Sequence, residues 1–296
     1  MNSVDRLLLG TLRLVHRWQF GLKLRWHTSE QGRLAYLQST GERTGPTLVI
    51  LHGLGASKDQ WGPAILGMAR RHPCLFVDLP GHGQSLYAPS AGYGPQALLA
   101  ALEGLLDKVV EGPFVLVGSS LGGCVAGLYA ARHPQRVSHL VLLAPAGLGP
   151  NALGPALQAG LQGQGSVFGY RTVEEMRQFW RLLFRQPPRV GGRLAQAMAA
   201  SGRARFAAVQ RVVEDFRREG LDVLLDRLPQ IVSRTLVIWG QHDQVFLPAT
   251  LDHLLQQLPD ARGQLIEDSG HVPYLERGAE VVTAITGFIS APGPAR

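Results

Sequence analysis

The stretch that decides the fold is Phe114-Val115-Leu116-Val117-Gly118-Ser119-Ser120-Leu121-Gly122. Its four leading apolar residues predict a short buried strand of the parallel type. A helix-forming stretch runs from Leu121 to His133. Gly-x-Ser-x-Gly between a strand and a helix forms a tight turn, in which glycines let the backbone crowd together and the serine hydroxyl is lifted above the sheet edge. We therefore predict that Ser120 is a nucleophile facing a cleft.

The composition is that of an ordinary globular protein, with 296 residues, 45% hydrophobic and 17% charged. The net charge of +7 favours contact with anionic surfaces. No basic cluster interleaved with aromatic residues is present, so we expect no nucleic-acid partner. The two cysteines, Cys74 and Cys124, lie in apolar contexts and predict packed thiols rather than a disulfide framework.

Strand and helix patterns alternate along the chain. After an antiparallel hairpin over residues 22–36, apolar runs predict strands at 47–51, 75–78, 114–117, 140–143, 236–239 and 264–266. Helical patterns lie between them at 95–110, 121–133, 248–258 and 278–290. Apolar strands alternating with helices predict an α/β fold with a mostly parallel sheet covered on both faces.

One segment interrupts this alternation. Residues 147–228 show no strand pattern but helical stretches, and we expect residues 148–228 to form a helical cap over a core made of residues 22–147 and 229–296. Gly149, Pro150 and the stretch 160–165 read as flexible entry sequence. The candidate pocket walls in the cap are Phe168, Phe179, Trp180, Phe184 and Phe206.

A serine hydroxyl needs a base to take its proton and an acid to orient that base. In a strand–turn–helix architecture of this kind the acid and then the histidine follow the serine along the chain. Asp243 follows the strand at 236–239, and His271 follows the strand at 264–266. Both lie at the sheet edge where open α/β sheets bind ligands. We predict that Ser120, His271 and Asp243 are the nucleophile, the base and the orienting acid.

Other polar residues at this edge are alternatives for the same roles. His242 stands in the position of the acid, and Asp268 is near His271 in sequence and could orient it. His52 and His82 follow earlier strands, where loop histidines are usually structural. Asp78 ends a strand before a turn, and we expect it to bind the backbone of that turn.

The tetrahedral intermediate of acyl transfer needs N–H donors for its oxyanion. The backbone N–H of Leu121 and that of Leu54, in the loop His52-Gly53-Leu54-Gly55, are the candidates. Gly53 lets substrate approach this loop closely, and Val272, directly after His271, is a further candidate for substrate contact. No metal-ligand spacing and no phosphate-binding loop is present, so we expect no metal and no cofactor.

Residues 3–19 have a helical period and predict an N-terminal amphipathic helix within residues 1–21. Leu7, Leu8, Leu12, Leu14, Val15 and Trp18 share one face, and Arg6, Arg13 and Arg17 lie opposite. No uncharged stretch approaches the roughly 20 residues of a membrane span. Two interpretations remain open: a helix lying in a lipid interface, and a helix packed on its own domain or on a second subunit.

With these residues the chain resembles the α/β-hydrolases, and within them the monoacylglycerol-lipase-like branch of serine hydrolases. The similar stretches are His52 to Trp61, Gly118 to Ala131, Pro145 to Leu148 and Ser269 to Pro273. The resemblance implies a cytoplasmic carboxylic ester hydrolase without cofactor, acting on small acyl esters such as monoacylglycerols or lysophospholipids. Members of the branch often carry an N-terminal membrane segment, which favours peripheral membrane contact through residues 3–19. The oligomeric state is left open.

Other chemistries of the same superfamily give alternative functions. Haloalkane dehalogenases and epoxide hydrolases use a carboxylate at the position of Ser120, which argues against both. Carbon–carbon hydrolases of ring-cleavage products usually carry Trp after the catalytic histidine, where this chain has Val272. They remain the leading alternative enzyme, and perhydrolases share the serine turn. A ligand receptor that keeps an intact triad is the alternative outside enzymes.

Overall fold

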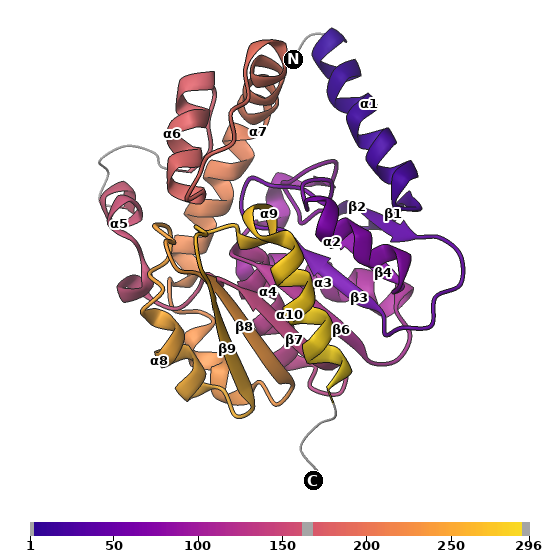
Figure 1. The fold of residues 1–296 in the computed structure, drawn as a ribbon, viewed down its shortest axis with the longest axis vertical. Helices are drawn as coiled ribbons and strands as arrows, with labels where there is room; N and C mark the ends of the chain where they lie inside the picture. The colour runs from indigo at the N-terminus through magenta and orange to yellow at the C-terminus, as the bar shows by residue number, and fades with distance from the viewer. Residues whose placement is uncertain (1–2, 162–167, 292–296) are drawn as a thin grey trace.

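A nine-stranded, mostly parallel sheet organises the computed structural model of the chain, which describes residues 3–161 and 168–291 (Figure 1). The strand order is β1-β2-β4-β3-β6-β7-β8-β9, and β5 pairs with β2. β1 and β2 form the predicted antiparallel hairpin, and the pairs from β4 to β9 along this order are parallel. The strands are β1 Leu22–Ser29, β2 Gly32–Ser39, β3 Leu48–Leu51, β4 Cys74–Val77, β5 Leu86–Tyr87, β6 Phe114–Ser119, β7 Val137–Leu143, β8 Arg234–Gly240 and β9 Ala261–Ile266.

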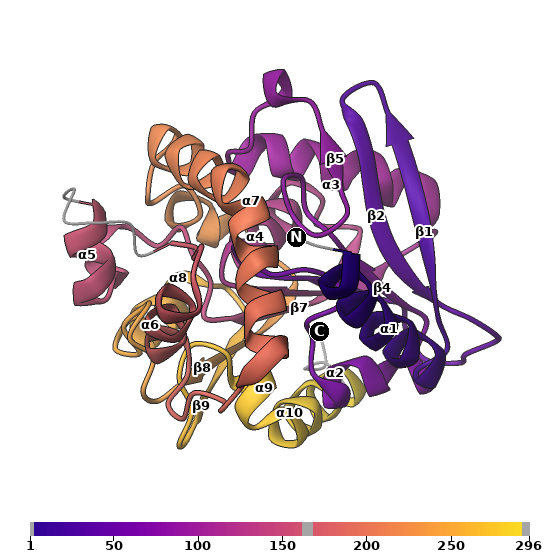
Figure 2. The same cartoon turned by 90° about the horizontal axis from the view of Figure 1, so that it is seen from above.

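Helices cover both faces of the sheet, as the apolar strands predicted. Along β3, Val49 and Leu51 point into one core, whereas Leu48 and Ile50 point into the other. α3 and α4 pack on the first face, and α2 and α10 on the second (Figure 2). The core helices are α2 Pro63–Gly67, α3 Pro95–Val109, α4 Leu121–Arg132, α8 Thr250–Gln257, α9 Pro273–Glu276 and α10 Gly278–Ser290. The predicted α/β fold is confirmed.

The chain between β7 and β8 has no strand among its described residues. It forms α5 Pro155–Leu161, α6 Val173–Leu183 and α7 Gly192–Glu219, with 3₁₀ helices at Pro150–Ala152 and Leu225–Gln230. α6 and α7 rise together above the sheet in Figure 1. Of the expected glycine-rich entry, residues 162–165 lie outside the described residues.

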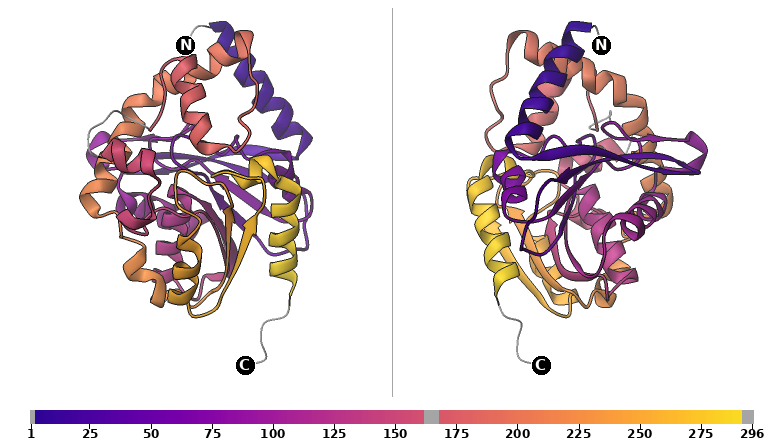
Figure 3. Two further views of the ribbon diagram at one scale, coloured as in Figure 1. Left: turned by 60° about the vertical axis from the view of Figure 1, so that its left-hand side comes forward. Right: turned by 90° about the vertical axis from the view of Figure 1, so that its right-hand side faces the viewer.

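The N-terminal helix α1, Ser3–Gln19, is present with the predicted bounds, at the same end of the molecule as α6 and α7 (Figure 3). Whether this helix lies in a lipid interface or packs on its own domain was left open by the sequence. In the structure Arg17 contacts the domain: its guanidinium donates to both carboxylate oxygens of Asp59, at 2.9 and 3.1 Å. Arg13 lies 3.9 Å from the same carboxylate. The helix therefore rests on its own domain through arginines.

The opposite face of α1 is uncovered in the structure. Leu7 is 70% exposed, Leu14 is 64% exposed and Trp18 is 86% exposed. Leu12 and Val15 are exposed as well, whereas Leu8 is partly buried. No helix in residues 3–161 and 168–291 combines the length and the apolar character needed to cross a bilayer.

Candidate active site

Ser120 occupies a strained turn between β6 and α4. Its φ of 52° and ψ of −116° lie outside the regions that L-residues favour, a strain that costs on the order of 1–3 kcal/mol and is concentrated at functional sites. The turn is held by the N–H of Ser120, which donates to the Leu143 carbonyl at 2.9 Å. A Cβ on Gly122 would come within 2.3 Å of the Leu51 carbonyl oxygen, so glycine is required there for close packing.

Asp243 and His271 form a buried hydrogen-bonded pair. The Asp243 Oδ2 lies 2.8 Å from Nδ1 of His271, and both side chains are almost fully buried. The other carboxylate oxygen accepts the backbone N–H groups of Val245 at 2.8 Å and Phe246 at 3.0 Å. These three bonding partners fix the carboxylate plane, and with it the imidazole ring.

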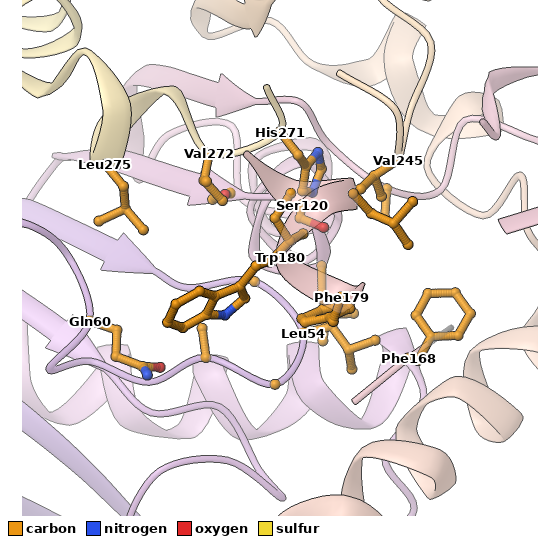
Figure 4. Close-up of a pocket in the computed structure, with 18 of the residues that line it drawn as sticks. Leu54, Gln60, Ser120, Phe168, Phe179, Trp180, Val245, His271, Val272 and Leu275 are labelled. Carbon is orange, nitrogen blue, oxygen red and sulfur yellow. The ribbon is translucent and has the colours of Figure 1, made fainter. Parts of the chain in front are cut away.

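His271 and Ser120 lie next to each other in the wall of a large cavity (Figure 4). The fold brings the three predicted triad residues together because β6, β8 and β9 are parallel and end at the same edge of the sheet. Asp268, the alternative acid, and His242, the competing histidine beside Asp243, are exposed and have no hydrogen bond to His271 among the described residues.

The two expected oxyanion donors flank the serine. Gly53 packs on the turn closely enough that an added Cβ would meet Cβ of Ser120 at 3.2 Å, which places the Leu54 loop against Ser120. Leu121 is the first residue of α4, where an N–H has no acceptor within its helix. Within residues 3–161 and 168–291, neither the Leu54 N–H nor the Leu121 N–H donates to a protein group.

The cavity beside Ser120 has a volume of about 530 Å³ and a mostly apolar wall. The walls come from the turn at Ser120, the helical insertion, the loops after β3, β8 and β9, and His16 of α1. Phe206 was expected in the wall but does not line the cavity, because it packs under the guanidinium of Arg171 at 4.6 Å. The other candidates all line it: Gly53, Phe168, Phe179, Trp180, Phe184 and Val272.

Histidines 52 and 82 are structural parts of the same sheet edge. His52 bonds the Gly53 carbonyl through Nδ1 and accepts the Leu79 N–H at Nε2, so its neutral form is satisfied on both sides. Burial lowers the pKa of His52 to about 4 and that of His82 to about 3. His52 thereby ties the Leu54 loop to the loop after β4.

A buried ion cluster, which the sequence did not reveal, fixes the same two loops. Lys58 is fully buried, and its ammonium donates to Asp78 at 2.7 Å, to Asp59 at 3.1 Å and to Gln84 at 2.9 Å. Asp78 also accepts the backbone N–H groups of Lys58 and Gln84, as expected for a residue that holds a turn. Arg17 of α1 completes the cluster through Asp59.

Glu276 is a second residue that sequence reasoning missed. Its carboxylate accepts the Gly270 N–H at 2.7 Å, next to His271, and the Gln186 N–H at 3.0 Å, in the segment between α6 and α7. The His271 N–H donates to the Leu183 carbonyl at 2.7 Å. The histidine loop is thus bonded to the helical insertion on both sides. In the described part of the chain, no three His, Cys, Asp or Glu side chains lie together as metal ligands.

The chain is similar in sequence to lipases. It is 26% identical to the monoacylglycerol lipase ABHD6 of Homo sapiens over 93% of this chain and 84% of the relative. It is also 26% identical to Lipase 1 of Psychrobacter immobilis, over 98% of this chain and 92% of that one.

The comparison of structures agrees. A bacterial membrane phospholipase A, described as a virulence factor, superposes with a TM-score of 0.89 at 29% identity, covering 97% of this chain and 91% of that one. The model of the α/β-hydrolase fold matches residues 46–278. The chain therefore belongs to the α/β-hydrolase family, and within it to the branch of lipases and esterases.

Proposed function

We propose that this chain hydrolyses carboxylic esters of lipids through an acyl-enzyme intermediate. The observation that carries the proposal is the buried His271–Asp243 pair at 2.8 Å beside a strained Ser120, in the wall of an apolar cavity. This is the arrangement of a nucleophile, its base and the group that orients the base.

The residues act in a fixed order. Ser120 Oγ attacks the ester carbonyl while Nε2 of His271 takes its proton, and Asp243 stabilises the imidazolium that forms. The N–H groups of Leu54 and Leu121 donate to the oxyanion. His271 then gives the proton to the leaving alcohol, and a water attacks the acyl-enzyme by the same steps.

The cavity indicates the substrate class. A space of about 530 Å³ with aromatic and aliphatic walls fits an acyl chain better than a charged acid. Monoacylglycerols and lysophospholipids with acyl chains of medium length combine such a chain with a small ester-bearing head. The names of the relatives, a monoacylglycerol lipase and a membrane phospholipase A, agree with this class.

Labelling with a fluorophosphonate, followed by a panel of esters of increasing chain length, tests the proposal. Ser120→Ala should abolish labelling and lower kcat by about 10⁶-fold. Ser119→Ala is the matched control and should retain both the labelling and the kcat of the wild type. A triad-bearing receptor would label without sustained turnover, and a carbon–carbon hydrolase would prefer a ring-cleavage product to every ester. Equal effects of the two serine variants would exclude Ser120 as the nucleophile.

We further propose that the apolar face of α1 lies in a lipid interface. Large side chains of one helix face are exposed, Trp18 by 86%, whereas Arg13 and Arg17 lie against Asp59. His16 on the same helix lines the cavity beside Ser120, so a lipid held beside α1 would be close to that cavity.

Vesicle co-sedimentation tests this contact. Replacing Leu7, Leu14 and Trp18 by Ser should lower binding to phospholipid vesicles by more than about a hundredfold, since each loses roughly 1.5–3 kcal/mol of burial in lipid. Hydrolysis of a soluble short-chain ester should stay intact. Equal co-sedimentation of variant and wild type would refute the contact, and a change in oligomeric state would assign the face to a second subunit instead.

A further inference from the structure

A second cavity, of about 410 Å³, lies in the helical insertion and is unlike the first in its chemistry. Three arginines line it: Arg177 and Arg181, one turn apart on α6, and Arg189 from the segment that leads to α7. The rest of its wall consists of Trp180, Pro187, Pro188, Val190 and Gly191.

These arginines have little countercharge of their own. Arg181 is 4.0 Å from Glu174, and no ion pair or hydrogen bond of the Arg177 or Arg189 guanidinium occurs within residues 3–161 and 168–291. Like charges four residues apart on a helix repel each other, as Arg177 and Arg181 do here. A bound anion would relieve this repulsion. Guanidinium groups match a phosphate particularly well, because their paired N–H donors bind two oxygens at once.

The two cavities adjoin each other. Trp180, Pro188 and Val190 line both of them, so these three side chains form a shared wall. In the close-up of the first cavity, the indole of Trp180 extends from the side of Ser120 toward Gln60 (Figure 4). An apolar compartment next to a cationic one suits a ligand that joins a hydrocarbon chain to an anionic group.

We propose that Arg177, Arg181 and Arg189 form a binding site for the phosphate group of a phospholipid, beside the cavity that takes the acyl chain. The inference rests on the proposed lipid esterase function and extends it, because monoacylglycerols lack the phosphate that this site would bind. The phosphate belongs to the substrate itself or to a neighbouring membrane lipid, and the two sources give different experimental results.

The test uses the full-length chain with all three arginines replaced by glutamine. A matched control carries Arg71→Gln, Arg227→Gln and Arg262→Gln, which remove the same charge from exposed positions outside both cavities. The first measurement compares kcat and KM for the hydrolysis of lysophosphatidylglycerol with those for the monoacylglycerol of the same chain length, both in micelles of an uncharged detergent. The second measures binding to vesicles of phosphatidylglycerol and of phosphatidylcholine at two salt concentrations.

If the site holds the substrate phosphate, the cavity variant should raise KM for the lysophospholipid about tenfold or more, with kcat unchanged and monoacylglycerol hydrolysis intact. If it holds a membrane lipid, KM stays the same for both substrates, and binding to vesicles falls well below that of the control variant. Equal behaviour of the cavity and control variants in both measurements would overturn the proposal. Failure of the esterase function itself is recognised separately, by hydrolysis that survives Ser120→Ala.

Discussion

Asp243→Asn isolates the role of one buried carboxylate, because the substitution changes charge and donor pattern but almost no volume. One oxygen of Asp243 accepts the N–H groups of Val245 and Phe246. The amide oxygen of asparagine must stay there, since an NH₂ group facing two N–H donors would leave all of them unsatisfied. The NH₂ group then faces Nδ1 of His271, which can only accept, and the ring proton moves to Nε2.

A protonated Nε2 cannot take the proton of Ser120. We therefore expect kcat to fall by about 10⁴, which corresponds to about 5 kcal/mol in the activation free energy. KM should change little, because Asp243 does not line the acyl cavity.

The assay is steady-state hydrolysis of a soluble ester together with the rate of fluorophosphonate labelling, and both should fall in parallel. Asp268→Asn is the control, an exposed carboxylate in the same loop as His271. A severe loss in the Asp268 variant alone, or an Asp243 variant with near-normal kcat, would refute the reasoning.

Three further predictions concern the supports of the site. Glu276→Gln places an NH₂ group against a backbone N–H and should lower the free energy of unfolding by about 1–3 kcal/mol and also lower kcat, measured by urea denaturation and ester hydrolysis. Arg17→Gln and Asp59→Asn should show a coupling of about 1–2 kcal/mol in a double-mutant cycle, and additive effects would contradict the bond between α1 and the body. Because burial lowers the pKa values of His52 and His82, the unfolded chain takes up protons first as the pH falls below 6.5. The free energy of unfolding should then drop by about 1.4 kcal/mol per pH unit for each histidine between pH 6 and about 4, and urea midpoints that rise on acidification would exclude this.

The strands could be predicted because their signal is local. An apolar run buried on both faces needs no partner to be recognised, and β3 and β6 begin within a residue of the predicted positions. The strand boundaries differ from the predicted ones where polar residues pair inside the sheet. β7 begins at Val137, three residues before the predicted start, because Ser138 and His139 lie at the end of the strand outside the apolar run.

That the three candidate triad residues meet in space was predictable for a related reason. Parallel strands that end at one edge bring the residues just after them together, whatever their separation along the chain. The supports of the triad lack such a signal. Lys58 stands among polar residues and reads as part of a solvated loop, yet it is fully buried. Its ammonium meets the carboxylate of the adjacent Asp59, together with the carboxylate of Asp78 and the amide of Gln84 from a distant part of the chain. Glu276 could have been noticed only from its position five residues after His271.

The orientation of α1 shows what periodicity leaves undetermined. A helical period separates an apolar face from a basic one, but it does not say which face the protein itself covers. In isolation the apolar face would be expected to pack inward, since burial of leucine and tryptophan is favourable. The decisive partner is Asp59, which stands beside Lys58 in a nearly buried cluster and accepts from Arg17. Satisfying that cluster turns Arg13 and Arg17 inward, whereas Leu7, Leu14 and Trp18 face outward. The exposed apolar face of α1 thus follows from the ion pairs that Asp59 makes inside the domain. Only a surface outside the domain could bury that face.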